Sequence, residues 1–181
     1  MLTLIGLVPA LVFAILWLAL LAFLRQRRNA GWVQLLLVAI FGVYNFAVLH
    51  ITLLEYQSLL VLKLFNPDLI LRGIETGSLN LVPLIGLTSG DLQTSLLNIL
   101  MLVPFGFGLP FITRLRFGKT VTYGALFSLA IECLQWLTGH LAGTTFRVAD
   151  INDLIFNTVG AAIGYLLFAL FTRLLPLRTT A

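Results

Sequence analysis

The chain has 181 residues, of which 60% are hydrophobic and only 10% are charged, and its mean hydropathy is +1.05. A soluble domain has about 45–50% apolar and about 25% charged residues, so these values exclude an ordinary soluble domain and indicate one compact membrane protein. The net charge is +4 at pH 7, and the single cysteine, Cys133, excludes an internal disulfide. Since Cys133 lies in an apolar run, we expect a buried, inert thiol.

The first two apolar stretches are each long enough to cross a bilayer, which requires about 20 residues. Leu2–Leu24 ends in a basic cluster, Arg25 to Arg28, and has no small-residue cleavage site after it. We therefore expect a retained span with its N-terminus outside, and not a cleaved signal peptide. Trp32–Leu54 is the second predicted span, with an interfacial tryptophan at its entry.

A long loop separates these two spans from three more. Glu55–Thr94 contains several prolines and glycines, and its short apolar piece Leu59–Phe65 is predicted to lie at the membrane interface. The remaining predicted spans are Ser95–Thr113, Thr120–Leu137 and Leu154–Thr172. The predicted fold is therefore an all-α transmembrane bundle of about five helices.

Basic residues are distributed unevenly between the two sides that these spans define. Eight of the eleven fall on one side, at Arg25, Arg27, Arg28, Arg114, Arg116, Lys119, Arg173 and Arg178. The other side holds Lys63, Arg72 and Arg147. Because cytoplasmic loops are enriched in Lys and Arg, the N-terminus is predicted outside and the C-terminus in the cytoplasm. The basic charge balance then requires no nucleic-acid partner.

Several polar side chains lie within the predicted spans, and this topology places them at a similar depth. Glu132 is about 12 residues, or about 18 Å, from the cytoplasmic start of its span. The others lie towards the outer ends of their spans, at His50, Asn98, Gln135 and Asn157. An ionisable residue inside a span costs about 2.5–3.5 kcal/mol on insertion scales. We therefore expect a polar cavity open to the extracytoplasmic face, with Glu132 as its first functional candidate.

The last span carries a polar stripe that becomes a stripe of small residues. Residues spaced by three or four positions share one face of a helix. On this span they are Arg147, Asp150, Asp153, Asn157, Gly160 and Gly164. The aspartates near the helix start suit its positive dipole end, and a guanidinium suits carboxylate or phosphate oxygens. The glycines are predicted to allow close contact with a neighbouring helix.

Each of these residues also has a structural explanation. Asn98 and Asn157 can hydrogen-bond between helices without any ligand, and His50 near the interface can be a tolerated amphipathic residue. Carboxylates of this kind suit hard cations such as Mg²⁺. However, the sequence has no cofactor motif and only two histidines, so we predict neither a cofactor nor a metal site.

Four motifs together resemble the VanZ-like family of bacterial membrane proteins. They are NLVP at Asn80–Pro83, NILMLVPFGF at Asn98–Phe107, IECLQ at Ile131–Gln135 and FRVADINDLIFNTVGAAIGY at Phe146–Tyr165. The positions that match the family pattern are Asn98, Pro104, Glu132, Gln135, Arg147, Asp150, Asp153, Asn157 and Gly160. The resemblance implies a four-helix core, so residues 1–31 are an additional N-terminal helix and basic turn, and residues 32–181 form the VanZ-like domain. It also implies a multi-pass protein of the bacterial inner membrane.

The family is named for teicoplanin resistance, which directs the leading hypothesis for function. It is an outward-facing pocket that binds an amphiphilic ligand: a lipid headgroup, a lipid-linked wall precursor or a glycopeptide antibiotic. Arg147 would contact anionic oxygens, and Asp150 and Asp153 would hold Arg147 or a cation. The residues expected to orient the polar groups of the ligand are Glu132, Gln135, Asn98 and Asn157, and His50 is a further candidate ligand-binding residue.

Other functions remain open at this stage. One is a membrane transferase or hydrolase acting on a lipid-linked precursor, with Glu132 as general acid or base. Another is a purely structural role for the polar groups. Active transport is less favoured, because the polar residues gather at one end of the bundle. The GAAIG stretch, Gly160–Gly164, can pack either within one chain or between two copies, so a homo-oligomer is also possible.

Overall fold

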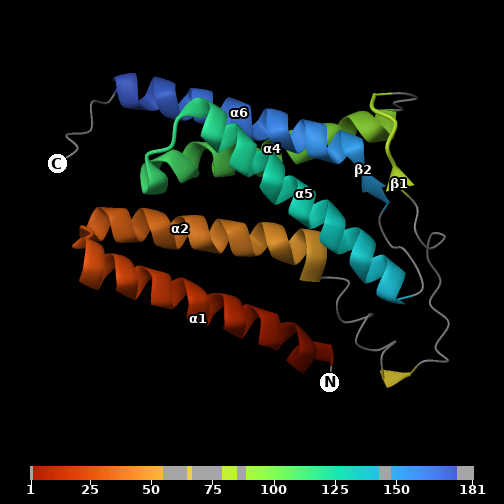
Figure 1. Cartoon of the computed structure of the whole chain (residues 1–181), viewed down its shortest axis with the longest axis horizontal. Coiled ribbons are helices and arrows are strands. Elements are labelled where there is room, and N and C mark those ends of the chain that lie inside the picture. Colours follow the sequence, from red (N-terminus) through yellow and green to blue (C-terminus); the bar gives the residue numbers. More distant parts are fainter. Residues whose placement is uncertain (1, 55–64, 67–78, 85–88, 143–147, 175–181) are drawn as a thin grey trace. The chain divides into compact units, whose positions relative to one another are not determined.

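The computed structural model describes residues 2–54, 65–66, 79–84, 89–142 and 148–174. Arg147 and residues 59–64 of the predicted interfacial segment lie outside these ranges. The chain divides into two compact units. The first comprises Met1–Ile85 and Leu129–Ile151, and the second comprises Gly86–Ser128 and Asn152–Ala181. The described residues are almost entirely helical, as predicted for an all-α protein (Figure 1).

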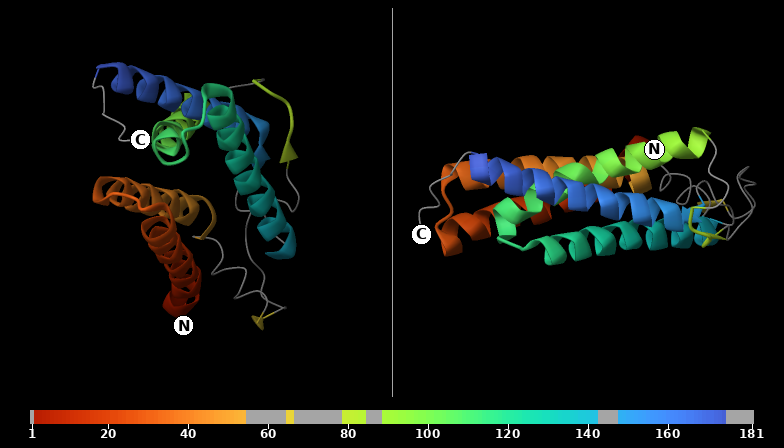
Figure 2. Two further views of the ribbon diagram at one scale, coloured as in Figure 1. Left: turned by 60° about the vertical axis from the view of Figure 1, so that its left-hand side comes forward. Right: turned by 90° about the horizontal axis from the view of Figure 1, so that it is seen from above.

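In the first unit, α1 (Leu2–Arg28) and α2 (Trp32–Leu49) lie side by side in Figures 1 and 2. A tight turn joins them, with Asn29 in the left-handed region at φ 49°, a conformation that asparagine tolerates better than most residues. Arg25 stabilises the turn through two contacts. Its Nη1 donates to the carbonyl of Ala30 at 3.0 Å, and its guanidinium lies 4.8 Å from the centre of the Trp32 ring. A π-helical segment, η1 (His50–Leu54), continues α2.

A part-buried hydrogen bond joins α1 to α2. The indole Nε1 of Trp17 donates to the carbonyl of Val38 at 3.0 Å. A side chain at Gly42 would collide with that indole, since a Cβ there would lie 2.1 Å from Nε1. The glycine therefore provides the space that the Trp17 ring occupies.

The second unit is built on close contact between α4 (Ser89–Thr113) and α6 (Ile151–Leu174), which cross in Figure 2. A Cβ at Gly160 would lie 2.2 Å from the carbonyl oxygen of Ile99, and one at Gly164 would lie 2.1 Å from that of Val103. On the other helix, a Cβ at Gly106 would lie 2.0 Å from the carbonyl oxygen of Ala161. The prediction that the glycines of the last span permit close helix packing is confirmed.

Helix α5 (Phe117–Ala142) contributes residues 117–128 to the second unit and 129–142 to the first. A short parallel pair, β1 (Leu79–Asn80) with β2 (Ala149–Asp150), completes the first unit. The thiol of Cys133 is exposed on α5, so the expectation of a buried thiol was wrong. The neighbouring Glu132 is buried. Successive side chains on an α-helix are rotated by about 100°, so Cys133 points in a different direction from Glu132.

Four of the described helices are long and apolar enough to cross a membrane. Their spans are Pro9–Arg28, Trp32–Leu53, Gly90–Thr113 and Ile151–Leu174, which agree with four of the five predicted spans. The fifth prediction, Thr120–Leu137, lies within α5, which is long enough to cross but less apolar, since it carries Glu132 and Gln135. The total of five membrane spans and the orientation of the chain in the membrane remain predictions.

Candidate functional site

Glu132 is held in a polar cluster that combines three separate segments of the first unit. The backbone N–H of Asp150 donates to Oε2 of Glu132 at 3.1 Å. In turn, Nδ2 of Asn80 donates to Oδ2 of Asp150 at 3.0 Å. We call Asn80, Glu132 and Asp150 the carboxylate cluster. It brings together a residue of β1, a residue of α5 and the last residue of β2, which immediately precedes α6.

The backbone explains why these side chains meet. The parallel pairing aligns Asn80 with Asp150, so their side chains occupy neighbouring positions on the two strands. Asp150 directly precedes Ile151, the first residue of α6. Backbone N–H groups at a helix start lack intrahelical partners and carry positive partial charge. A carboxylate acceptor is favoured at this position, which accounts for a Glu132 side chain that is only 8% exposed.

Gln135 makes a second polar contact in the same unit, one turn further along α5. Its Nε2 donates at 2.9 Å to the carbonyl of Thr52 in the π-helical segment. The Thr52 hydroxyl donates back to the carbonyl of Val48 at 2.8 Å. π-Helical turns interrupt the regular ladder of helix hydrogen bonds and are frequent at functional sites. His50 belongs to this segment, but it is exposed and its ring contacts Phe46 at 6.0 Å.

The second unit holds the remaining predicted site residues in two side-chain pairs. Nδ2 of Asn98 on α4 donates to Oδ1 of Asp153 on α6. Nδ2 of Asn157 on α6 donates to the Ser128 hydroxyl oxygen at 2.9 Å. Asn157 is only 2% exposed, and its Oδ1 has no hydrogen-bond partner among the described residues. These pairs match the interhelical hydrogen bonds that asparagines form in membrane bundles.

The predicted site residues are therefore distributed between the two units. Glu132, Gln135 and Asp150 have partners in the first unit, whereas Asn98, Asp153 and Asn157 have partners in the second. Arg147 lies outside the described residues. Within the described ranges, no group of three His, Cys, Asp or Glu side chains is arranged to hold a metal ion.

Three hydrogen-bond partners of the predicted site residues were not identified from the sequence. Asn80 stood in the NLVP motif, but nothing in that short motif indicates which acid it contacts. Ser128 lies one helical turn before Glu132, a spacing that could have singled it out. Thr52 contributes its backbone carbonyl, and side-chain identity gives no signal for such a role.

The apolar helices define an all-α membrane protein, and several of its helices carry buried polar residues. The sequence model of the VanZ/LLP1 family matches residues 10–172. The chain belongs to the VanZ/LLP1 family, and the resemblance seen in its motifs is confirmed. Neither a curated protein nor a solved structure matches the chain.

Proposed function

We propose that this chain is a cell-envelope membrane protein whose carboxylate cluster belongs to an outward-facing pocket for the polar part of an amphiphilic or lipid-linked ligand. The single observation that carries the proposal is the convergence of Asn80, Glu132 and Asp150 from three segments. Glu132 lies well inside α5, where an ionisable residue is costly to insert into a membrane, and Asp150 directly precedes α6. Helix packing alone does not call for such a concentration of acids.

The proposed ligand has a polar headgroup and a hydrophobic tail, because the cluster belongs to a chain with four helices apolar enough to cross a membrane. A phospholipid headgroup, a lipid-linked wall precursor and a lipoglycopeptide such as teicoplanin all meet this description. The family name connects the fold with teicoplanin resistance. We therefore propose that the pocket faces outwards from a bacterial inner membrane, where wall precursors and the antibiotic meet.

The test measures protein abundance and envelope phenotype in parallel. Glu132→Gln and Arg147→Ala are expressed in a susceptible bacterium, and teicoplanin sensitivity and lipid-linked precursor levels are followed. Thr122→Val is the matched control on the same helix, because Thr122 is exposed and its hydroxyl bonds only within α5, to Gly118. We expect the two site variants to accumulate normally and lose the phenotype, while the control retains it.

Two other outcomes have clear meanings. Full phenotype in both site variants would refute the pocket. Loss of membrane abundance in both, with Thr122→Val unaffected, would mean that the polar groups only hold helices together.

An enzyme acting on a lipid-linked precursor is the second candidate, because Glu132 is a nearly buried carboxylate. Environments of this kind are typical of general acids and bases. The discriminating variant is again Glu132→Gln, assayed for binding and turnover of a labelled precursor in membranes. Retained binding with lost turnover would favour the enzyme, whereas loss of binding would favour the binding protein.

A further inference from the structure

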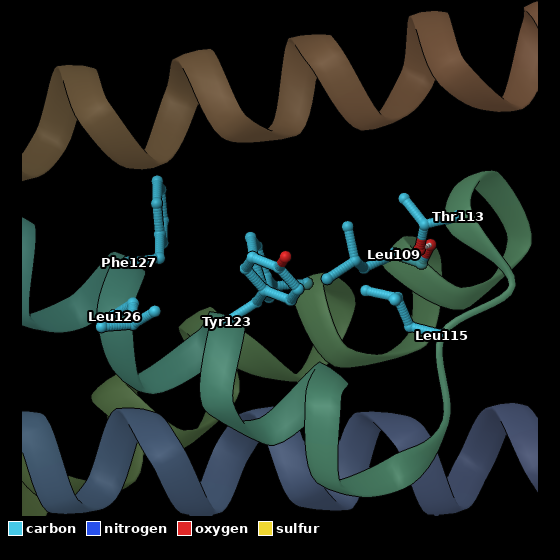
Figure 3. Close-up of a pocket in the computed structure, with 7 residues that line it drawn as sticks. Leu109, Thr113, Leu115, Tyr123, Leu126 and Phe127 are labelled. Carbon is cyan, nitrogen blue, oxygen red and sulfur yellow. Dashed lines mark hydrogen bonds between the residues drawn. The ribbon is translucent and has the colours of Figure 1, made fainter.

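An apolar groove lies between α4 and α5 within the second unit, with a volume of about 440 Å³. Its lining residues are Phe105, Leu109, Thr113, Leu115, Tyr123, Leu126 and Phe127. Figure 3 shows Thr113 and Leu115 at one end, Leu126 and Phe127 at the other, and Tyr123 between them. Sites for small ligands typically have volumes of about 300–1,000 Å³ and mainly apolar walls, so this groove can accept a hydrocarbon chain.

One end of the groove coincides with a cluster of positive charge. Thr113 and Leu115 flank Arg114 in the turn between the two helices, Arg116 ends this turn, and Lys119 lies in the first turn of α5. All three basic side chains are exposed. We call Arg114, Arg116 and Lys119 the basic turn. The sequence contains no acidic residue from 92 to 131, so no carboxylate within this stretch neutralises the basic turn.

Arg114 occupies a backbone position that does not favour arginine. It follows the last residue of α4 with φ at 56°, and its N–H donates to the carbonyl of Pro110 at 2.9 Å. This left-handed helix cap is most often glycine, because a side chain makes the conformation unfavourable. The fold of the turn therefore does not account for an arginine there.

We propose that the groove and the basic turn form a binding site for an anionic phospholipid. The phosphate of the headgroup is bound by Arg114, Arg116 and Lys119, and one acyl chain lies along Leu109, Tyr123 and Leu126. Guanidinium groups bind phosphate oxygens in bidentate geometry, and basic pockets beside transmembrane helices select anionic headgroups. This site uses none of the residues of the carboxylate cluster, so it goes beyond the proposed function.

The test measures lipid binding to the purified full chain in neutral detergent by native mass spectrometry. Dioleoylphosphatidylglycerol and dioleoylphosphatidylcholine are compared, because they share acyl chains and differ in net charge. We expect tighter binding of the anionic lipid. Each basic residue changed to Gln should weaken that binding about fivefold, as about 1 kcal/mol per charge implies, and high salt should weaken it in the unaltered chain.

A matched triple variant separates a specific site from general attraction to basic residues. Arg114→Gln, Arg116→Gln and Lys119→Gln are combined in the first variant. The control combines Arg27→Gln, Arg28→Gln and Arg173→Gln, which removes the same charge from exposed arginines at other helix ends. The site variant should lose the preference for the anionic lipid, and the control should keep it.

Two further substitutions keep the proposal testable if the triple variant does not fold. Arg114→Gly removes one charge while suiting the left-handed backbone, and should still weaken anionic-lipid binding. Leu126→Trp fills the groove and should weaken binding with all charges intact, whereas Leu166→Trp, at an exposed position on α6 outside the groove, should not.

Several results would overturn the site. They are equal binding of the two lipids, equal losses in the site and control triple variants, and unchanged binding in Leu126→Trp. Inorganic phosphate that bound as tightly as the lipid would show that the groove holds no acyl chain, and would overturn it too.

Discussion

At the scale of single residues, the most informative side chain is Glu132. Its carboxylate accepts a hydrogen bond from the backbone of Asp150, so the acid has a structural partner as well as a candidate role in binding. A buried acceptor that is removed leaves its donor without a partner, and that loss exceeds the net value of the bond itself. The structural and functional contributions of Glu132 can therefore be separated by choosing the substitution.

We predict that Glu132→Ala destabilises the protein more than Glu132→Gln. Alanine removes the Glu132 oxygen that accepts from the Asp150 N–H, at a cost of about 1–3 kcal/mol, whereas the glutamine carbonyl can still accept the bond. Reversible unfolding in detergent, followed by circular dichroism, measures the difference. Equal destabilisation by both substitutions would show that charge, and not the hydrogen bond, is what Glu132 contributes to stability.

At the scale of elements, glycine determines how closely α4 and α6 approach. The Gly160 and Gly164 positions face carbonyl oxygens of α4, which belong to backbone and cannot rotate away. Any side chain there must move a helix. The same lack of a side chain has a smaller consequence at Gly42, where the neighbour is the Trp17 ring.

We predict that Gly160→Ala lowers the free energy of unfolding by about 1–3 kcal/mol, as overpacking in a tight core does. Gly118→Ala on α5 is the control, because nothing lies within 4 Å of a Cβ there. That change should be neutral or stabilising by up to about 1 kcal/mol, since alanine favours helix over glycine. Thermal unfolding in detergent measures both, and equal effects would contradict the close packing of α4 against α6.

Gly42→Ala should cost less than Gly160→Ala, because the Trp17 indole can rotate whereas a carbonyl cannot. The rotation breaks the hydrogen bond from Trp17 to Val38, so the tryptophan emission should shift. A chain with Trp32→Phe and Trp136→Phe reports Trp17 alone, as the sequence has three tryptophans. An unchanged emission spectrum in Gly42→Ala would contradict the contact between α1 and α2.

At the scale of the whole molecule, the number of membrane-crossing helices depends on α5. Four helices are apolar enough to do so by length and composition, and α5 falls outside that group because of its polar side chains. A polar helix can still cross when its polar groups are satisfied by other helices. The distribution of basic residues predicts that α5 crosses the membrane.

We predict that cysteines at Gly118 and His140, at opposite ends of α5, lie on opposite sides of the membrane. Both positions are exposed, and the exposed native thiol is first removed by Cys133→Ala. A membrane-impermeant maleimide should label residue 140 in intact cells and residue 118 only after permeabilisation. The predicted orientation also places Gly31→Cys inside and Leu81→Cys outside, and labelling of both ends of α5 from one side would refute the fifth span.

The apolar helices, the membrane class and the family could all be predicted from sequence. Each depends on a stretch of about 20 residues or on a short motif, and hydrophobicity over such a window is a local property. The observed helices extend beyond the predicted spans, from Leu24 to Arg28 in α1 for example. Helical hydrogen bonding continues into polar residues at the interface, whereas a hydropathy window ends there.

Only the tertiary structure decided which polar groups meet. Asn80 and Asp150 are 70 residues apart, and Gln135 bonds to a backbone carbonyl 83 residues earlier. A sequence pattern shows that Glu132 is costly to bury, but it does not show that its carboxylate accepts a hydrogen bond from a backbone N–H beside the start of α6. Every residue except proline carries a backbone N–H. The position of Asp150 in space, and not its residue type, therefore makes its N–H a partner of Glu132.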